Sequence, residues 1–375
     1  MMPNAGRPTM TAPQASAPET GQPSPQQPHA GWIVLTLAVG TASGWLFQGL
    51  GVPLPWMLGS LCACGILAIA GLPLAMPKII RSVVLPLLGV MLGTNFSPSF
   101  LGQLLNYAVT LAAMIALMAV LGWGAVTYYR RIAGFDHPTG FFAGMPGGLV
   151  DMAVLGEEAG GDVRRIALVH ATRIAVIVAT VPFIVQFAEH VSLGPRQSTP
   201  VSIWAASPST YVWVVGVALA GVMLGQILRL PAKFMLGPLI LSAIVHGGGW
   251  TDFVIPSEII NAAQVFLGCA SGCRFTGFAR RELVTIIGHS VITNGVLVAV
   301  TCAVAWLLAP YSAGGFSSVL LAFAAGGLSE MSLVALALHL DIAFVLVHQL
   351  ARIALVIVIA PFAFRAGPNQ PPNRG

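Results

Sequence analysis

The sequence has very little charge: Asp, Glu, Lys and Arg together make up only 8% of its 375 residues. Soluble domains carry roughly 25% charged residues, because their surfaces face water. Hydrophobic residues make up 56% of this chain, and its mean hydropathy is +0.85. Apolar runs of about 20 residues, enough to cross a bilayer core, recur from Trp32 to Phe364. The composition excludes a soluble protein and predicts an all-α, polytopic membrane protein.

The sequence also lacks the spacings that bind metals or haem. Its five cysteines follow no zinc or haem pattern, and its eight histidines are dispersed without a Glu-x-x-His motif. Copper or iron oxidation chemistry needs clustered histidine and carboxylate ligands. We therefore expect no cofactor, no metal and no enzymatic activity. A membrane enzyme with Asp151 and Glu330 as acid and base is the alternative.

The two ends of the chain differ from the rest. Residues 1–30 are rich in Pro, Gln, Ser and Ala, and such a segment cannot bury enough apolar surface to fold. We expect it to be a disordered tail, and 366–375 likewise. Basic residues are scattered over short loops, so we expect no direct binding of nucleic acid. Between the tails we expect one membrane repeat at 31–190, a linker at 191–210 and a second repeat at 211–365.

An internal duplication organises the membrane part. Gly147–Gly148–Leu149 and Gly326–Gly327–Leu328 lie 179 positions apart. Other residues match at the same offset, namely Gly89, Gly93, Phe96, Asp162, Arg173 and Pro182 with Gly268, Gly272, Phe275, Asp341, Arg352 and Pro361. Met57–Leu58–Gly59 matches Met235–Leu236–Gly237 after a gap of one residue. One register over most of a unit predicts two copies of six apolar segments each.

The basic loops indicate how the two copies are oriented. Lys and Arg in short loops mark the cytoplasmic side, and loops that are basic in one copy are bare in the other. The copies are therefore predicted to be inverted, which requires an odd number of crossings in each. The fifth segment is interrupted by Pro146–Gly147–Gly148 in one copy and by Gly326–Gly327 in the other. We expect ten crossings, two re-entrant hairpins and cytoplasmic termini. The alternative is that the fifth segment is a broken helix that crosses the membrane, and that a different, short segment does not cross it.

Inverted repeats with broken helices are typical of secondary transporters, whose binding sites lie at the repeat interface near mid-membrane. Irregular backbone at that depth is tolerated where it is buried in protein or lines a water-filled cavity. The residues around the two breaks are therefore the candidates for substrate or ion binding. They are Gly147, Gly148, Asp151, His170, Arg173, Gly326, Gly327, Glu330, His348, Gln349 and Arg352.

Each charged candidate has two interpretations. Asp151 and Glu330 either couple H+ or Na+ to transport, or contact a cationic solute, or else cap the freed N–H groups of their own half-helices. Arg173 and Arg352 either pair with these acids or bind a carboxylate or phosphate. The neighbouring histidines either relay protons or bond to another helix.

Four further polar positions have simpler explanations. Asp162 and Asp341 begin the sixth segments, where an acid complements the positive end of a helix. Asn95 and its counterpart Arg274 end the third segments. A helix end near the membrane surface accounts for them, so we rank them below the other candidates.

Three motifs carry a family resemblance. They are the Pro-Trp-Met-Leu-Gly-Ser run from Pro55, the paired Gly-Gly-Leu-x-acid-Met motifs, and the Asp-x6-His-Gln-Leu-Ala-Arg stretch ending at Arg352. On these motifs the chain resembles the bacterial AbrB membrane-protein family from Trp32 to Phe364. In the first copy the last motif departs, with Val169–His170 in place of the His-Gln pair.

The resemblance implies kinship with cation/proton antiporters and anion transporters. It also implies a bacterial cytoplasmic membrane location and a partnership with lipid and with a small solute, together with H+ or Na+. Elevator-type relatives are often dimers, which leaves a homodimer open. Labels in the family suggest an indirect regulator of gene expression, which is the alternative function, and an ammonia monooxygenase, which the dispersed histidines oppose.

Overall fold

The computed structural model describes residues 30–96, 104–189, 202–230, 232–278, 280–312 and 314–365. The predicted tails, apart from residue 30, lie outside these described residues, as do residue 190 and residues 191–201 of the predicted linker. The described part contains fourteen α-helices and three short 3-10 helices, with no strand. The all-α fold class is confirmed.

Each half of the chain supplies seven helices in the same order. The first half gives α1 (Ala30–Gly49), α2 (Pro55–Ile69), α3 (Lys78–Gly93), α5 (Ala108–Arg131), α6 (His137–Gly144), α7 (Leu149–Glu158) and α8 (Val163–Glu189). The second half gives α9 (Pro208–Ile227), α10 (Lys233–Gly247), α11 (Ser257–Gly272), α12 (Arg280–Leu308), α13 (Gly315–Phe323), α14 (Leu328–Ala337) and α15 (Ile342–Arg365). The 3-10 helices are η1 (Leu104–Tyr107), η2 (Cys273–Phe275) and η3 (Ala309–Tyr311). The twelve predicted segments are present, and the fifth of each half is a pair of half-helices. The inverted relation of the halves stays a prediction.

Six helices in the described part are long and apolar enough to cross a membrane: α1, α5, α8, α9, α12 and α15. Four others that we expected to cross, α2, α3, α10 and α11, have only 15 or 16 residues. At about 1.5 Å per residue they reach roughly 22–24 Å, less than the roughly 30 Å of a hydrocarbon core. The chain is a membrane protein, and the count of ten crossings stays a prediction.

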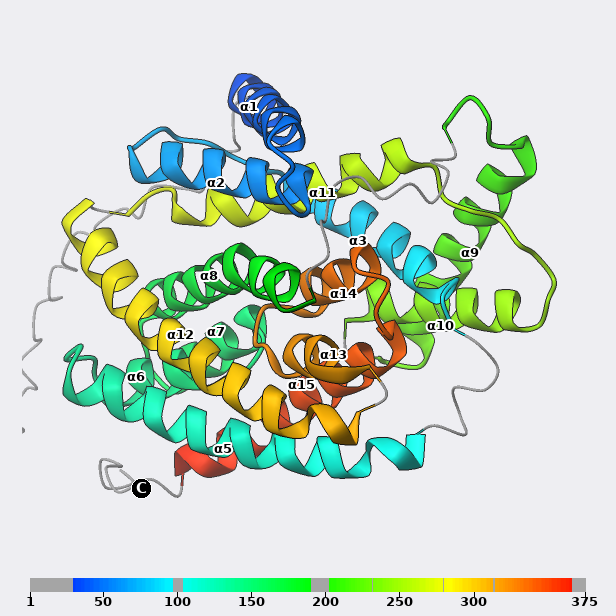
Figure 1. The fold of residues 1–375 in the computed structure, drawn as a ribbon. Coiled ribbons are helices and arrows are strands. Elements are labelled where there is room, and N and C mark those ends of the chain that lie inside the picture. The colour runs from blue at the N-terminus through cyan, green and yellow to red at the C-terminus, as the bar shows by residue number, and fades with distance from the viewer. Residues whose placement is uncertain are drawn as a thin grey trace, which may run out of the picture.

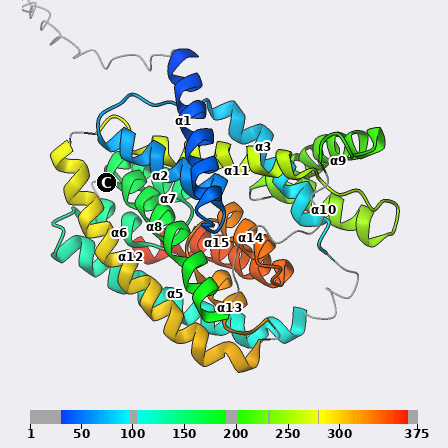
Figure 2. The same cartoon turned by 45° about the horizontal axis from the view of Figure 1, so that its top comes forward.

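The helices form two bundles, and each bundle takes helices from both halves. The first bundle combines α1, α2 and α3 with α9, α10 and α11, and the second combines α5–α8 with α12–α15. In Figure 1 the first bundle runs along the upper and right-hand side of the molecule, and the turned view of Figure 2 keeps the same grouping. The most extensive packing joins α3 to α10 and α2 to α11, so it crosses between the halves.

Glycines allow this close packing in the first bundle. A Cβ atom at Gly89 or Gly93 would overlap main-chain atoms of α10, and one at Gly268 or Gly272 would overlap main-chain atoms of α2. Small residues four positions apart let membrane helices approach closely, because dispersion contacts replace the hydrophobic effect in lipid. The matching glycines of the two copies therefore allow the same close packing. Those of α3 pack on α10, and those of α11 pack on α2, so each pair contacts the second helix of the other half.

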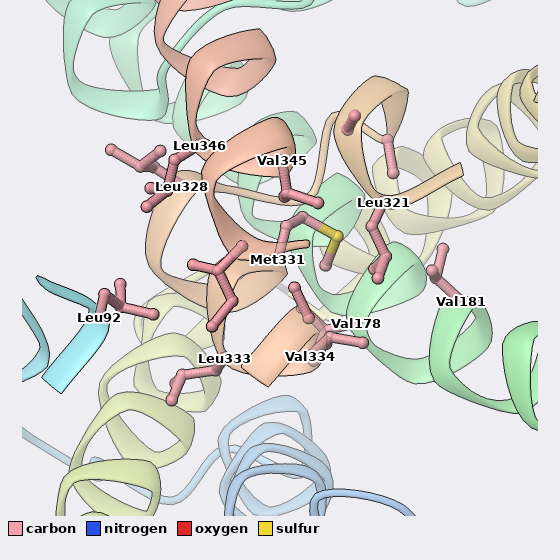
Figure 3. Close-up of a cluster of buried hydrophobic side chains, with 14 of the residues drawn as sticks. Leu92, Val178, Val181, Leu321, Leu328, Met331, Leu333, Val334, Val345 and Leu346 are labelled. Atoms are coloured by element: carbon pink, nitrogen blue, oxygen red, sulfur yellow. The ribbon is translucent and has the colours of Figure 1, made fainter. Parts of the chain in front are cut away.

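The half-helix α14 lies at the centre of the second bundle. Every residue from Leu328 to Ala335 is buried, and α14 packs against α3, α8, α13 and α15. Figure 3 shows Met331 and Val334 of α14 among side chains from α8, α13 and α15. Its counterpart α7 buries only two residues, Met152 and Gly156. The matching half-helices thus have different environments: one is central and the other peripheral.

The segment that contains α6 and α7 returns to where it begins. The backbone N–H of Asp162, which follows α7, donates a 2.8 Å hydrogen bond to the hydroxyl of Thr139 in the first turn of α6. Both half-helices pack on α8, as α13 and α14 pack on α15. Residues 137–162 therefore form a hairpin, as the re-entrant interpretation requires and the crossing-helix alternative does not.

Candidate functional site

Both fifth segments are interrupted at the glycines that the sequence singled out. Between α6 and α7 lie Met145, Pro146, Gly147 and Gly148, and proline has no N–H to continue a helix. A Cβ atom on Gly147 would crowd the side chain of Met152. Between α13 and α14, a Cβ atom on Gly326 would crowd Met331 and Ile177 of α8. Gly327 has φ +96° and ψ 144°, a conformation that is essentially restricted to glycine.

Buried side chains from α8 hold the carbonyl end of α6. The Arg173 guanidinium donates hydrogen bonds to the carbonyls of Met145 (2.7 Å), Ala143 (3.0 Å) and Gly144 (3.2 Å). His170 Nε2 bonds to the carbonyl of Phe142 at 2.9 Å. Since a carbonyl only accepts, Nε2 carries the proton, and Nδ1 lies 3.5 Å from Arg173 as an acceptor. The cation at the end of α6 complements the negative end of the helix dipole.

The second half repeats the main bonds of this arrangement at the same offset of 179 positions. Gln349 Nε2 donates to the carbonyls of Leu321 and Ala324, both at 2.8 Å. Arg352 Nη1 donates to the carbonyl of Ala324, also at 2.8 Å. Residues that match in sequence, His170 with Gln349 and Arg173 with Arg352, therefore also bind carbonyls at matching positions. The structure brings these four side chains to the two breaks, where they bind main chain.

One of the two interpretations of the arginines does not hold. No ion pair within 4 Å joins Arg173 or Arg352 to Asp151 or Glu330, all of which lie in the described part of the chain. The physical reason is that main-chain carbonyls at the half-helix ends already occupy the guanidinium groups. The last carbonyls of a helix have no N–H partner within the helix, so when they are buried they need other donors.

The two acids lie in the first turns of α7 and α14. Asp151 is half-buried, and its carboxylate lies directly over Gly148. Glu330 is 8% exposed; its carboxylate lies over Gly327 and accepts a 2.8 Å hydrogen bond from the Ser329 hydroxyl. Carboxylates in a first helical turn complement the positive end of the dipole. Both acids therefore lie at the breaks.

Asp162 and Asp341 have the structural role that we expected. Asp162 Oδ1 accepts hydrogen bonds from the backbone N–H groups of Arg164 (3.0 Å) and Arg165 (3.2 Å). Asp341 Oδ1 accepts one from Phe344 at 3.0 Å. Each carboxylate therefore caps the helix that follows it.

His348 is not part of the arrangement at the breaks. Its Nδ1 bonds to the carbonyl of Phe344 at 2.8 Å, and its Nε2 bonds to the hydroxyl of Thr110 on α5 at 2.9 Å. This is the bond to a neighbouring helix that we considered as one interpretation. It joins α15 to α5.

Arg274, which we ranked below the other candidates, lies in η2, where the first bundle meets α8. Its buried Nη1 has no hydrogen-bond partner among the described residues. The counterpart Asn95 instead donates to the Met91 carbonyl at 3.0 Å on its own helix. The matched positions of the two copies therefore differ in residue type and in hydrogen bonding.

An apolar cavity of about 350 Å³ lies behind the first break. It is lined by Met145 and Pro146 together with side chains of α5, α6 and α15, and no charged residue contributes to it. A cavity of this composition suits hydrocarbon better than a polar solute. We therefore do not place the solute there.

Comparison with known proteins identifies the family. A family model described as transition state regulatory protein AbrB matches residues 56–367, a range that includes both breaks. The chain belongs to the AbrB family. It is 27% identical over 358 residues to "Uncharacterized protein YhjN" of Bacillus subtilis (strain 168), which covers 88% of this chain and 91% of that protein. It is 24% identical over 337 residues to "Putative regulator AbrB" of Escherichia coli (strain K12), and this alignment covers 88% of this chain and 94% of that protein. The family resemblance that the motifs indicated is confirmed.

Proposed function

We propose that this AbrB-family membrane protein is a secondary transporter of a small solute, coupled to H+ or to another cation. It carries out no enzymatic step. Its site lies at the two breaks, and it acts in the bacterial cytoplasmic membrane with both termini in the cytoplasm. The inverted relation of the halves and the ten crossings belong to this proposal.

One observation carries the proposal: buried donors at matching positions bind matching carbonyls at both breaks. His170 and Arg173 do so on α6, and Gln349 and Arg352 do so on α13. These bonds fix the carbonyl ends, while each opposite half-helix begins with free N–H groups and one acid. Paired discontinuous helices of this kind provide main chain and charge for a solute near mid-membrane. A purely structural protein has no need of such breaks, since each exposes main-chain polar groups at a cost.

The test is uptake into proteoliposomes that contain the purified protein. Solutes are supplied under pH or sodium steps, and both tracer flux and current are recorded, so that electroneutral exchange is detected as well. We expect saturable uptake by the wild type and its loss in Asp151→Asn and Glu330→Gln. Glu157→Gln, which alters an exposed acid at the other end of α7, is the matched control and should leave uptake unchanged. Equal activity of all three variants would refute the role of the two acids.

A second candidate function is an indirect regulator of gene expression that senses a solute in the membrane. The name of the Escherichia coli relative favours it. This function predicts solute binding without flux, and a transcriptional change on deletion that solute-binding variants reproduce. Folded wild-type protein that binds a solute and moves none would support the regulator over the transporter.

A further inference from the structure

The apolar cavity behind the first break, here called the break cavity, borders the bilayer. Its lining residues include Ile115 and Trp123 of α5 and Ile359 of α15, which are 42%, 75% and 44% exposed. Both helices are long and apolar enough to cross a membrane, so exposed apolar side chains on them face hydrocarbon. An apolar cavity stays dry and takes up apolar molecules. A hydrocarbon chain from the bilayer can therefore enter the break cavity.

The break cavity is about as long as one leaflet is thick. Along α5 its lining runs from Ile115 to Val126, which is roughly 16 Å at about 1.5 Å per residue. Half of a hydrocarbon core of roughly 30 Å is about 15 Å. An extended lining of this length, around a volume of about 350 Å³, suits one acyl chain that lies along α5.

Both helices end in arginine just beyond the break cavity. Arg130 and Arg131 lie in the last turn of α5, about one turn after the lining residue Val126. Arg365 ends α15, two residues after the lining residue Ala363. Neither helix contains an Asp or a Glu, and Arg131 and Arg365 are exposed. The cavity therefore ends at an excess of positive charge.

The two arginine ends lie together, because both pack on α6. A Cβ atom on Gly140 of α6 would meet the side chain of Arg130. The ring of Phe364, next to Arg365, lies 5.3 Å from the ring of Phe141, measured between centroids. Asp136, the acid that precedes α6, caps this helix by accepting a hydrogen bond from a backbone N–H of its first turn. Arginines beside a membrane attract anionic lipid headgroups.

The second half has a cavity at the matching position, here called the matching cavity, with a volume of about 410 Å³ and a lining from α8 and α12. Four lining positions of the two cavities match at the offset of 179: Val176, Thr180, Ile184 and Val298 with Leu355, Ile359, Ala363 and Ala119. The positions that match the three arginines hold Ala309, Pro310 and Gln186. The apolar hollow is thus common to both halves, whereas the basic end belongs to the break cavity.

We propose that the break cavity binds an anionic phospholipid of the bilayer, with one acyl chain inside it and the phosphate at Arg131 and Arg365. Guanidinium groups bind phosphate through charge-assisted hydrogen bonds. The chain lies against Met145 and Pro146 of the first break, and the carbonyl of Met145 is the one that Arg173 binds at 2.7 Å. A bound lipid therefore stabilises the first break. This site is distinct from that of the transported solute.

Headgroup recognition is tested by native mass spectrometry of the purified full-length protein in detergent. The probes are dioleoyl phosphatidylglycerol and dioleoyl phosphatidylcholine, and the readout is the fraction of protein that retains one lipid. We expect phosphatidylglycerol to be retained at lower concentration than phosphatidylcholine. Its half-saturating concentration should rise roughly fivefold in Arg131→Gln and in Arg365→Gln, and roughly twentyfold in the double variant. Arg281→Gln, which alters an exposed arginine at the start of α12, is the control and should behave as the wild type.

Occupation of the cavity by the chain is tested by filling it. Ala119→Phe places a ring in the break cavity, and Ala179→Phe makes the same change in the matching cavity. Phosphatidylglycerol should raise the unfolding temperature saturably in the wild type and in Ala179→Phe, but not in Ala119→Phe. The unfolding temperature without lipid shows whether each variant is folded. If Ala119→Phe is not, Ile359→Trp fills the same cavity from an exposed position.

Three results would overturn the inference. Equal retention of the two lipids, or equal retention of phosphatidylglycerol by the wild type and the double arginine variant, would exclude recognition of the headgroup. An equal loss of stabilisation in Ala119→Phe and Ala179→Phe would exclude the break cavity as the specific site. Competition by sn-glycerol 3-phosphate at the concentration of the lipid would show that the phosphate binds without the chain.

Discussion

Gly148 and Gly327 occupy equivalent sequence positions but have different backbone conformations. Gly148 has φ −70° and ψ 142°, which any residue can adopt. Gly327 has φ +96° and ψ 144°, which L-residues avoid. In both cases a new Cβ would overlap the carboxylate three residues later, Asp151 or Glu330. Replacing each glycine with alanine therefore produces a similar side-chain clash, and the two variants differ mainly in backbone strain.

We expect Gly327→Ala to lower the free energy of unfolding by about 1–3 kcal/mol more than Gly148→Ala, because a residue held in a sparsely populated region costs that much. The measurement is reversible unfolding of the purified protein in mixed micelles titrated with SDS. The double variants with Asp151→Ala and Glu330→Ala remove the side-chain clash and should preserve the difference. Equal losses in the two alanine variants would refute the reasoning. So would a difference that disappears once the acids are truncated, since it would then come from the clash.

Three further predictions use the same unfolding assay. Arg173→Met should cost roughly 3–5 kcal/mol, because it leaves three carbonyls at the end of α6 and in the break without this donor. Arg352→Met should cost only roughly 1–2 kcal/mol, because Gln349 still bonds to Ala324; the opposite order would contradict the capping role. Gly237→Ala should cost about 1–3 kcal/mol, because its Cβ would overlap the Gly221 carbonyl of α9. Gly216→Ala, with no neighbour within 4 Å, should be neutral. Asp162→Ala should cost about 1 kcal/mol as a lost cap, and Asp162→Asn should retain much of the stability.

Much of the fold could be predicted because its signals are local in the sequence. Apolar runs gave the helices, and the Pro146–Gly147–Gly148 break follows from proline and glycine chemistry. The offset of 179 positions even paired the donors, since Gln349 matches His170. The interruption of both fifth segments also followed, and in the structure each is a pair of half-helices.

The partners of the charged groups could not be predicted, because they depend on packing in space. From the sequence, Asp151 and Glu330 were possible partners for Arg173 and Arg352. In the structure, main-chain carbonyls bind the guanidinium groups instead. A carbonyl carries no residue-specific signal, so no pattern of side chains reveals it. Arg274 was ranked low for a similar reason: its position at a helix end suggested the surface, whereas η2 packs against α8.

The exchange of helices between the halves also constrains how the chain can assemble. During synthesis, α2 and α3 emerge long before α10 and α11. The glycines of α3 pack on α10, and α2 receives the glycines of α11. An isolated first half would therefore expose main chain to lipid on two helices, and it should not reach a native fold. Co-expression of residues 1–195 and 196–375 as separate chains should recover a stable complex, whereas either fragment alone should be degraded.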